Sequence, residues 1–298
     1  MPRRASPYRG AAGAPDALAR RALAEDRVGR DRTTRALLSR PVAAEGRVVA
    51  QATGVLSGME VVRRIARAAG LRVTGALRDG AKVRSGTLVV RLLGDARRIL
   101  AVERSVLNVL LHASGVASAT ARAVRASRGS APRLEVWGTR KTLPGLRDLE
   151  NAAIVHGGGR PHRRDLSDAI LVKNNHLALV PLAEAVRRAR AAARPGERVE
   201  VEVRTAAEAV RAARAGAPAL LLDNAGPRRA RAIVHRLETT GLRRGRWVEL
   251  SGGITPGRVA AYRRVGADAV SLGSLTHSAP ALPFHLELCP ARLSARRT

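Results

Sequence analysis

The sequence predicts an α/β protein, and three observations lead to that prediction. The chain has 298 residues, enough for one large domain or two ordinary ones. Hydrophobic residues make up 45% of it but Phe, Trp and Tyr only 2%, so the core must be built from aliphatic side chains. After about residue 130, short apolar runs alternate with amphipathic segments, which is typical of parallel strands joined by crossover helices.

The N-terminal part has a mixed pattern. Short apolar stretches bounded by glycine, at 46–58, 71–77 and 86–94, are typical of strands. Amphipathic segments predict helices at 59–70 and 95–127, the second with a break near Gly115. We therefore expect four parts, in this order: a loose tail (1–15), an N-terminal α/β domain (16–128), a barrel domain (129–278) and a C-terminal segment that returns to the N-terminal domain (279–298).

Six successive apolar runs after residue 130 end in charged, hydroxyl-bearing or glycine residues. In chain order these ends carry Arg140 and Lys141, Lys173, Glu202, Asp223, Ser251 with Gly252 and Gly253, and Gly273. They lie roughly 20 to 30 residues apart, about one strand–helix unit. Because the carboxyl ends of parallel strands meet at one face of a barrel, we expect these residues to form one site.

The cations among these residues indicate an anionic ligand. The loop at 157–164 adds His162 and Arg163 to Arg140, Lys141 and Lys173. Such a cluster repels itself unless an anion fills it, and guanidinium groups bind carboxylates and phosphates in a bidentate way. The glycines at 252–253 and 273 would let backbone N–H groups approach a phosphate.

Two acids, Glu202 and Asp223, end neighbouring strands. Such a pair can hold Mg²⁺ together with substrate oxygens, or stabilise positive charge at a sugar carbon. With the cations, it suggests transfer of a phosphorylated sugar, with loss of pyrophosphate, to an acceptor that carries carboxylates.

Single histidines and tryptophans are more often structural than functional. We expect His162 to be functional because Arg163 and Lys173 lie near it in the pattern, and His112 to be structural. His176 and His277 follow strand ends, and either interpretation fits them. Trp137 lies in an apolar run and is most simply a core residue.

At these residues the sequence is similar to the quinolinate phosphoribosyltransferase family, also called carboxylating nicotinate-nucleotide pyrophosphorylases. The shared motifs run in order through most of the chain: GVLSGME (54–60), ERSVLN (103–108), GTRKTLPGLRDLE (138–150), GGGRPHR (157–163), DAILVKNNH (168–176), VEVEV (199–203), LLLDN (220–224), ELSGGI (249–254) and SLGSLTHSAPALPFHLEL (271–288). The combination of TRKTLPGLR with LTHSAP is highly specific.

The resemblance implies the fold, the reaction and the assembly. The fold would be a type II phosphoribosyltransferase, an N-terminal open-faced α/β sandwich with a C-terminal partial (β/α) barrel. Quinolinate and phosphoribosyl pyrophosphate would give nicotinate mononucleotide, pyrophosphate and CO₂, with Mg²⁺, in a cytoplasmic homodimer or an oligomer of dimers.

The resemblance also assigns roles by motif. Arg140, Arg163 and Lys173 would hold the quinolinate carboxylates, and Arg104 would reach into the partner subunit's site. Glu202 and Asp223 would face the ribose and the metal–pyrophosphate, and Lys141, Lys173, Glu202 and Asp223 would be the catalytic group. The remaining substrate-binding positions would be Thr139, Lys141 and His162, with Ser251, Gly252, Gly253, Leu272, Gly273 and Ser274 at the 5′-phosphate.

Four positions depart from the family pattern. Asn174 stands where the family usually has Asp, and Pro161 where it usually has Asn; Arg164 and Asp165 also differ from the usual residues. A sister family associated with molybdenum transport shares most motifs, but we expect it to lack the lysine that matches Lys173. A phosphoribosyltransferase for another small aromatic acid is the nearest alternative.

The charge of the chain leaves a different class open. The formal net charge is +30, and it could reflect nucleic-acid binding, polyanionic substrates or an arginine-biased surface. The near absence of aromatic residues and of a binding motif argues against nucleic acid. The single cysteine, Cys289, excludes a disulfide framework and a Cys-based zinc site, and we expect no membrane-spanning segment and no secretory signal.

Overall fold

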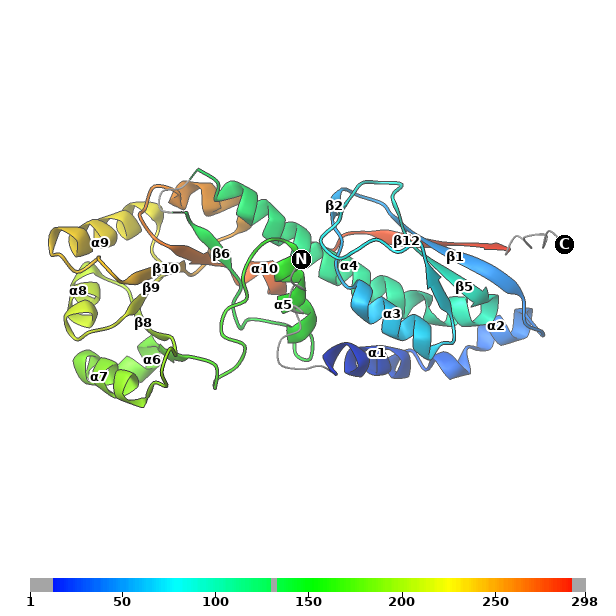
Figure 1. Cartoon of the computed structure of the whole chain (residues 1–298), viewed down its shortest axis with the longest axis horizontal. Helices are drawn as coiled ribbons and strands as arrows, with labels where there is room; N and C mark the ends of the chain where they lie inside the picture. The colour runs from blue at the N-terminus through cyan, green and yellow to red at the C-terminus, as the bar shows by residue number, and fades with distance from the viewer. Residues whose placement is uncertain (1–12, 130–132, 291–298) are drawn as a thin grey trace. The chain divides into compact units, whose positions relative to one another are not determined.

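The computed structural model describes residues 13–129 and 133–290. They form two compact units (Figure 1). The first contains residues 13–119, 143–157 and 279–290, and the second contains residues 120–142 and 158–278, apart from the undescribed 130–132.

The first unit is built on a four-stranded antiparallel sheet in the order β12-β1-β5-β3. These strands are β1 (Ala43–Ala50), β3 (Arg72–Thr74), β5 (Leu88–Asp95) and β12 (Phe284–Pro290), and a small second sheet pairs β2 (Gly54–Val55) with β4 (Lys82–Val83). Along β1, Ala44, Val48 and Ala50 are buried, whereas Glu45 and Arg47 form an ion pair on the other face. One face therefore packs on the core and the other is open, which confirms the expected open-faced sandwich.

The first unit also contains helices. They are α1 (Ala14–Glu25), α2 (Arg32–Leu37), α3 (Met59–Ala68), the first part of α4 (Ala96–Ala126) and α5 (Arg147–His156), with a 3₁₀ turn at Val28–Arg30. Asp79 accepts a hydrogen bond from the Met59 N–H and so stabilises the start of α3. Aliphatic side chains from α3 and α4, such as Ile65 and Ile99, pack with those of β1 and β5 in one core.

The expected break at Gly115 is wrong, because α4 runs through that residue. A Cβ atom at position 115 would lie 2.4 Å from the carbonyl oxygen of Pro280, so glycine is needed there for close packing, not to end the helix. In the described part of the chain α4 is the one helix long and apolar enough to cross a membrane. Because 61% of its most apolar window is buried in the protein, we interpret it as a core helix.

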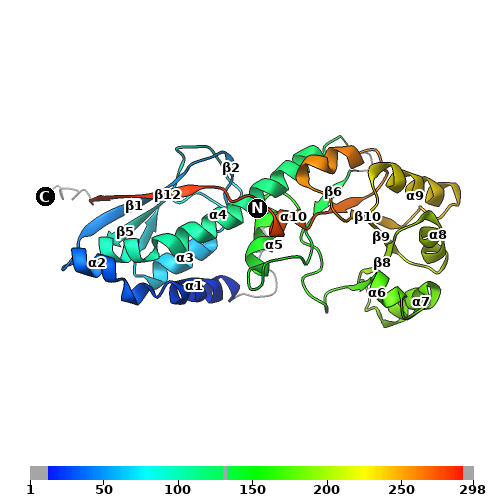
Figure 2. The same ribbon diagram turned by 180° about the vertical axis from the view of Figure 1, so that it is seen from behind.

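The second unit is a six-stranded parallel sheet in the order β6-β11-β10-β9-β8-β7, which confirms the predicted partial barrel. Its strands are β6 (Glu135–Trp137), β7 (Ile170–Val172), β8 (Val199–Val203), β9 (Ala219–Asp223), β10 (Trp247–Ser251) and β11 (Ala269–Ser271). Figure 2 shows the strands as an arc with α7 (Leu182–Ala192), α8 (Ala206–Arg214) and α9 (Pro227–Thr239) outside it. Three shorter helical segments complete this unit: α6 (Asn174–Leu177) between β7 and α7, a 3₁₀ helix (Pro256–Tyr262) after β10 and α10 (Ser274–His277) after β11.

The barrel is open between its edge strands, β6 and β7. The helix that follows β6 in the sequence is α5, and it belongs to the first unit, although the boundaries expected from the sequence place it with the barrel. Leu149 and Ile154 of α5 join the core of the first unit, and its buried Glu150 bonds to His112 of α4 at 2.9 Å. That bond agrees with the structural interpretation of His112.

Candidate active site

The polar strand ends of the second unit converge on one pocket, a cavity of about 430 Å³ at the carboxyl ends of the barrel strands. Thirteen residues expected from the sequence line it: Thr139, Arg140, Lys141, His162, Arg163, Lys173, Glu202, Asp223, Ser251, Gly252, Gly253, Gly273 and Ser274. Strand-end residues spread over more than a hundred positions of the sequence therefore share one cavity, as the spacing predicts.

One side of the pocket is cationic. The pKa of the Arg163 guanidinium is lowered by burial and by the nearby charge of Arg140. Arg163 uses one nitrogen to bind the Ala169 carbonyl at 3.1 Å, while Nε of Arg140 is buried and, among the described residues, has no hydrogen-bond partner. Two guanidinium groups that repel each other, one with an unused donor, form a site for a carboxylate or phosphate.

Two carboxylates also line the pocket, and Asn174 bonds to both of them. The side-chain amide of Asn174 donates to Glu202 at 2.8 Å and to Asp223 at 3.4 Å, and its backbone N–H donates to Glu202 at 3.2 Å. Burial and the nearby Asp223 raise the pKa of Glu202, while the Asn174 N–H and the charge of Lys173 oppose that rise. The residue that departs from the family pattern thus bonds both members of the carboxylate pair.

A glycine turn after β10 forms the third wall. Gly252 and Gly253 have φ angles of +95° and +59°, a left-handed backbone that directs successive N–H groups into a concave surface. A Cβ atom on Gly252 would lie 2.3 Å from the side-chain oxygen of Asn224, so no larger residue fits without a shift. Asn224 itself lines the pocket. Asn224 was not among the residues expected at the site, although its place directly after Asp223, at the end of an apolar run, was a signal that could have indicated it.

Two histidines that the sequence left open are now placed. His277 lines the pocket, where its ring lies near Gly273 and its Nδ1 is 2.6 Å from Oγ of Ser278. His176 accepts a hydrogen bond from the Lys173 N–H at 2.9 Å at the start of α6, and it is exposed outside the pocket. His277 therefore joins the site, and His176 has a local structural role.

Two expected residues do not line the pocket. Leu272 is fully buried and its N–H donates to the Trp137 carbonyl at 3.0 Å, so that N–H is not available to a phosphate. Arg104 lies on α4 in the first unit with a 66% exposed side chain, 3.7 Å from Glu103. Its expected role in a partner's site stays a prediction.

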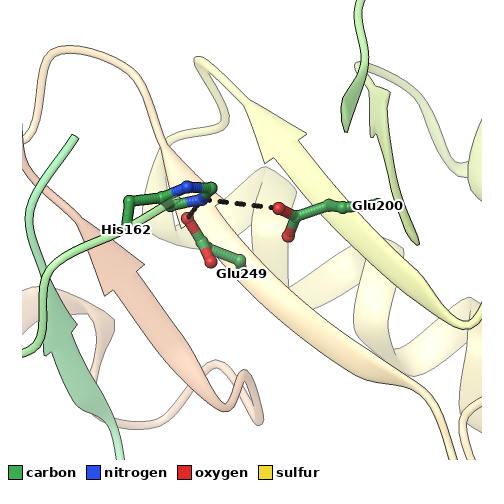
Figure 3. A group of neighbouring side chains, drawn as sticks. All are labelled: His162, Glu200 and Glu249. Atoms are coloured by element: carbon green, nitrogen blue, oxygen red, sulfur yellow. Dashed lines mark ion pairs between the residues drawn. The ribbon is translucent and has the colours of Figure 1, made fainter. Parts of the chain in front are cut away.

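His162 also points towards two carboxylates, Glu200 of β8 and Glu249 of β10 (Figure 3). Its Nε2 lies 3.5 Å from Glu200 and 3.3 Å from Glu249, two carboxylates that are 1% and 0% exposed. Burial lowers the pKa of His162, but the two carboxylates outweigh burial and raise it to about 9. Trp137, expected in the core, contacts the edge of this ring, with 5.9 Å between ring centroids.

Comparison with known proteins supports one family. Residues 31–114 match the model of the quinolinate phosphoribosyl transferase N-terminal domain, and residues 116–287 match that of its C-terminal domain. A probable nicotinate-nucleotide pyrophosphorylase [carboxylating] of Archaeoglobus fulgidus is 38% identical over 244 residues, covering 82% of this chain and 94% of that protein. The nicotinate-nucleotide pyrophosphorylase [carboxylating] of Mycobacterium leprae is 38% identical over 279 residues, covering 90% and 95%.

Solved structures agree with the sequence relatives. The crystal structure of NadC from Streptococcus pyogenes superimposes with a TM-score of 0.85 at 36% identity, covering 93% of this chain and 97% of that one. The open barrel and its pocket define a phosphoribosyltransferase. The chain belongs to the quinolinate phosphoribosyltransferase family, whose enzymes make nicotinate mononucleotide for NAD biosynthesis.

Proposed function

We propose that this chain transfers the phosphoribosyl group of phosphoribosyl pyrophosphate to quinolinate and releases CO₂, giving nicotinate mononucleotide and pyrophosphate. One observation carries the proposal: a cluster of cations, Arg140, Arg163 and Lys173, and a pair of carboxylates, Glu202 and Asp223, line a single cavity. A dicarboxylate acceptor and a phosphorylated sugar donor have the charges that these two groups of residues require.

The cationic side fits quinolinate better than a monocarboxylic acid. Quinolinate carries two adjacent carboxylates, and Arg140 and Arg163 offer two forked donors whose mutual repulsion an anion relieves. Lys173 and Lys141 add two point charges at the same mouth. These side chains would fix the ring so that its nitrogen faces the sugar.

The donor would occupy the acidic side and the glycine turn. The N–H groups of Gly252 and Gly253, with Ser251 and Ser274, would hold the 5′-phosphate. Glu202 and Asp223 would face the ribose, where their charge stabilises the positive character that develops at its C1.

The residues present fit Mg²⁺. The ion takes one or two protein carboxylates and completes its shell with water and substrate oxygens, and Glu202 and Asp223 lie in one pocket, bridged by Asn174. When bound, it neutralises charge on the leaving pyrophosphate. We propose Mg²⁺ as the cofactor and these two carboxylates as its holders, directly or through water.

The bond changes follow from this arrangement. The quinolinate nitrogen bonds to C1 of the ribose as the C1–oxygen bond to pyrophosphate breaks. The ring then carries a positive charge, so the bond from the ring to the carboxylate next to the nitrogen can break, releasing CO₂ and leaving an electron pair on the ring carbon. That carbon takes up one proton. Lys141 and Lys173 would stabilise the negative charges of pyrophosphate and of the carboxylate through these steps.

The test is a direct assay. Purified protein is mixed with quinolinate, phosphoribosyl pyrophosphate and Mg²⁺, and nicotinate mononucleotide and CO₂ are followed together, with nicotinate replacing quinolinate in a parallel reaction. We expect both products in equal amounts from quinolinate and no nucleotide from nicotinate. Product from nicotinate alone would contradict the proposed acceptor and favour a related phosphoribosyltransferase.

We further propose that the active form is a cytoplasmic homodimer in which Arg104 completes the partner's site. The exposed Arg104 side chain supports the role across the dimer, because its ion pair with Glu103 is long, 3.7 Å, and partly exposed, so the contact is weak.

A further inference from the structure

Lysine is rare in this chain, and it is concentrated in the pocket. Lys and Arg together number 54, but only three of these residues are lysines: Lys82, Lys141 and Lys173. Two of the three, Lys141 and Lys173, line the cavity. Lysine carries a compact charge on a flexible four-carbon stem, whereas the guanidinium group is a broad planar fork. A charge on a flexible stem acts at a defined place only if the protein holds that stem, and Lys141 is too exposed to be held by burial.

The backbone of Lys141 is fixed by the turn that joins β11 to α10. Oγ1 of Thr276 donates to the Lys141 carbonyl at 2.7 Å, although the two residues are 135 positions apart in the sequence. Thr276 is 2% exposed and does not line the pocket, so its hydroxyl is available to the loop and not to a ligand. The Lys141 N–H donates to Oγ1 of Thr139 at 3.1 Å. Both backbone polar groups of Lys141 are therefore bonded.

The Thr276 hydroxyl has a second acceptor nearby, the Gly273 carbonyl at 3.0 Å. A bond to the residue three positions earlier is common for threonine in helices and would make Thr276 an ordinary local structural residue. A hydroxyl has only one proton, however, and the shorter distance, 2.7 Å, is to Lys141. The Gly273 carbonyl also accepts from the N–H groups of Thr276 and His277 at 3.1 and 3.2 Å, so it does not depend on the hydroxyl.

The stem of Lys141 is directed by the absence of a side chain at Gly273. A Cβ atom there would lie 2.9 Å from Cδ of Lys141 and 3.0 Å from Nε2 of His277. The Lys141 stem and the His277 ring thus both pass close to this one glycine. Gly273 has an ordinary helical backbone, with φ −68° and ψ −30°, so its conformation does not require glycine. The requirement comes from the space that the Lys141 stem and the His277 ring occupy.

We propose that Thr276 is a positioning residue for Lys141: its hydroxyl holds the backbone of the lysine, while the space at Gly273 directs the lysine stem into the pocket. Thr276 thus acts through Lys141 and touches no substrate. The inference rests on the proposed function, because it takes Lys141 as a group that stabilises the negative charges of pyrophosphate and of the carboxylate during the reaction.

The first test measures the mobility of Lys141 without any substrate. Protein labelled with ¹³C at lysine Cε should give three side-chain signals, which are assigned by changing each lysine to arginine in turn. NMR relaxation should show Cε of Lys141 to be more restricted than that of the exposed Lys82. In Thr276→Val, Cε of Lys141 should become about as mobile as that of Lys82, whereas in Thr276→Ser it should stay restricted. Equal mobility in the two variants would overturn the proposal, and this failure is distinct from failure of the proposed reaction because no turnover is needed.

The second test is kinetic and uses the same two variants. Valine keeps the shape of threonine but removes the hydroxyl, so the Lys141 carbonyl loses its donor, whereas serine keeps the hydroxyl. We expect kcat to fall on the order of tenfold in Thr276→Val and by about threefold or less in Thr276→Ser, with the KM of both substrates changed by less than about threefold. The control is Thr240→Val, which removes a hydroxyl that donates to the Arg236 carbonyl at 2.8 Å and should keep the parent kcat. Equal kcat in Thr276→Val and Thr240→Val would show that the Thr276 hydroxyl only stabilises the fold.

The space at Gly273 is tested by Gly273→Ala. Alanine fits the helical backbone and keeps the N–H, so a phosphate bound by that N–H should still bind, whereas the new methyl group displaces the Lys141 stem. We expect kcat to fall on the order of tenfold and the KM for phosphoribosyl pyrophosphate to change by less than about threefold. Cε of Lys141 should become more mobile, as in Thr276→Val. A higher KM for phosphoribosyl pyrophosphate with unchanged kcat would assign Gly273 to the phosphate alone and overturn its proposed part in directing Lys141.

Discussion

Single side chains at the strand ends bring both cations and carboxylates into the pocket. Arg140 is the sharpest case, because its buried Nε has an unused donor among the described residues. A charge-assisted contact that is lost with the partner left in place costs about 2–5 kcal/mol. Arg140→Ala should therefore weaken quinolinate binding on the order of 100-fold, measured by calorimetry, with the melting temperature nearly unchanged.

The matched control for that variant is Arg160→Ala. Arg160 is a 64% exposed arginine whose Nε lies 3.0 Å from Glu135, and it does not line the pocket. It should keep normal quinolinate affinity. Unaltered affinity in Arg140→Ala would refute the clamp.

Asn174 carries a second prediction at this scale. It donates to both Glu202 and Asp223, so Asn174→Asp would replace a shared donor with a third carboxylate. Without Mg²⁺ at pH 7 we expect the free energy of unfolding to fall by about 1–2 kcal/mol, which lowers the melting temperature by a few degrees. Adding Mg²⁺ should raise the melting temperature of this variant more than that of the parent chain.

The pH dependence of that loss has a definite sign. A carboxyl group whose pKa is raised in the folded state costs stability above that pKa, and the cost disappears as the pH falls below it. The defect of Asn174→Asp should therefore shrink towards pH 4–5. Asn175→Asp, the same change at an exposed neighbour, is the control; the hypothesis fails if both variants melt alike with and without Mg²⁺.

Residue types at strand ends predicted most of the pocket, but not the partners of each side chain. Arg140, Lys173, Glu202 and Asp223 each follow an apolar run, so the period of the strand–helix unit was enough to bring them together. The contacts of His162 with Glu200 and Glu249 could not be predicted in this way, because the two glutamates lie inside two other strands. Their alternation with valine and leucine is equally typical of a strand with one exposed face.

At the scale of elements, the parallel strands were predictable and the path between them was not. Most strands of the second unit contain a short apolar run and β8 alternates valine with glutamate, and both patterns are local signals. The unit to which α5 belongs is determined by tertiary contacts, namely the Glu150–His112 bond and the packing of Ile154. No local sequence pattern contains these contacts. The same holds for Gly115, where the contact with Pro280 is distant in sequence.

The turn after β10 permits a prediction for one element. Gly252→Ala places a methyl group on a left-handed backbone, which costs about 1–2 kcal/mol, and pushes it against Asn224. The turn should distort, so the KM for phosphoribosyl pyrophosphate should rise at least tenfold, more than the KM for quinolinate. Gly257→Ala is the control, since a Cβ there meets open space and an ordinary backbone. A normal donor KM in Gly252→Ala would exclude the turn from phosphate binding.

At the scale of the whole molecule, the cationic residues behind the net charge of +30 have two roles. A few cations gather in the pocket, while many arginines bind backbone carbonyls at the ends of helices and loops, as Arg246 does with Ala213 and Arg231 with Arg264. The second group gives part of the arginine excess a local structural role. The field of the whole chain still favours the approach of anionic substrates.

The proposed dimer makes the strongest prediction at this scale. Arg104→Ala and Arg140→Ala should each be inactive, for reasons that lie in different subunits of the same site. In a mixed dimer, one of the two sites then pairs an intact Arg140 pocket with an intact Arg104 from its partner, whereas the other site lacks both. Random mixing makes half of the dimers mixed, so subunit exchange should restore about one quarter of the parent activity. Arg98→Ala on the same helix, whose side chain reaches the Ala69 carbonyl, should be active alone and serves as the control. If mixed dimers form, as shown by tagged subunits, but no activity returns, Arg104 does not act across the interface, and its exposed position on α4 must serve another purpose.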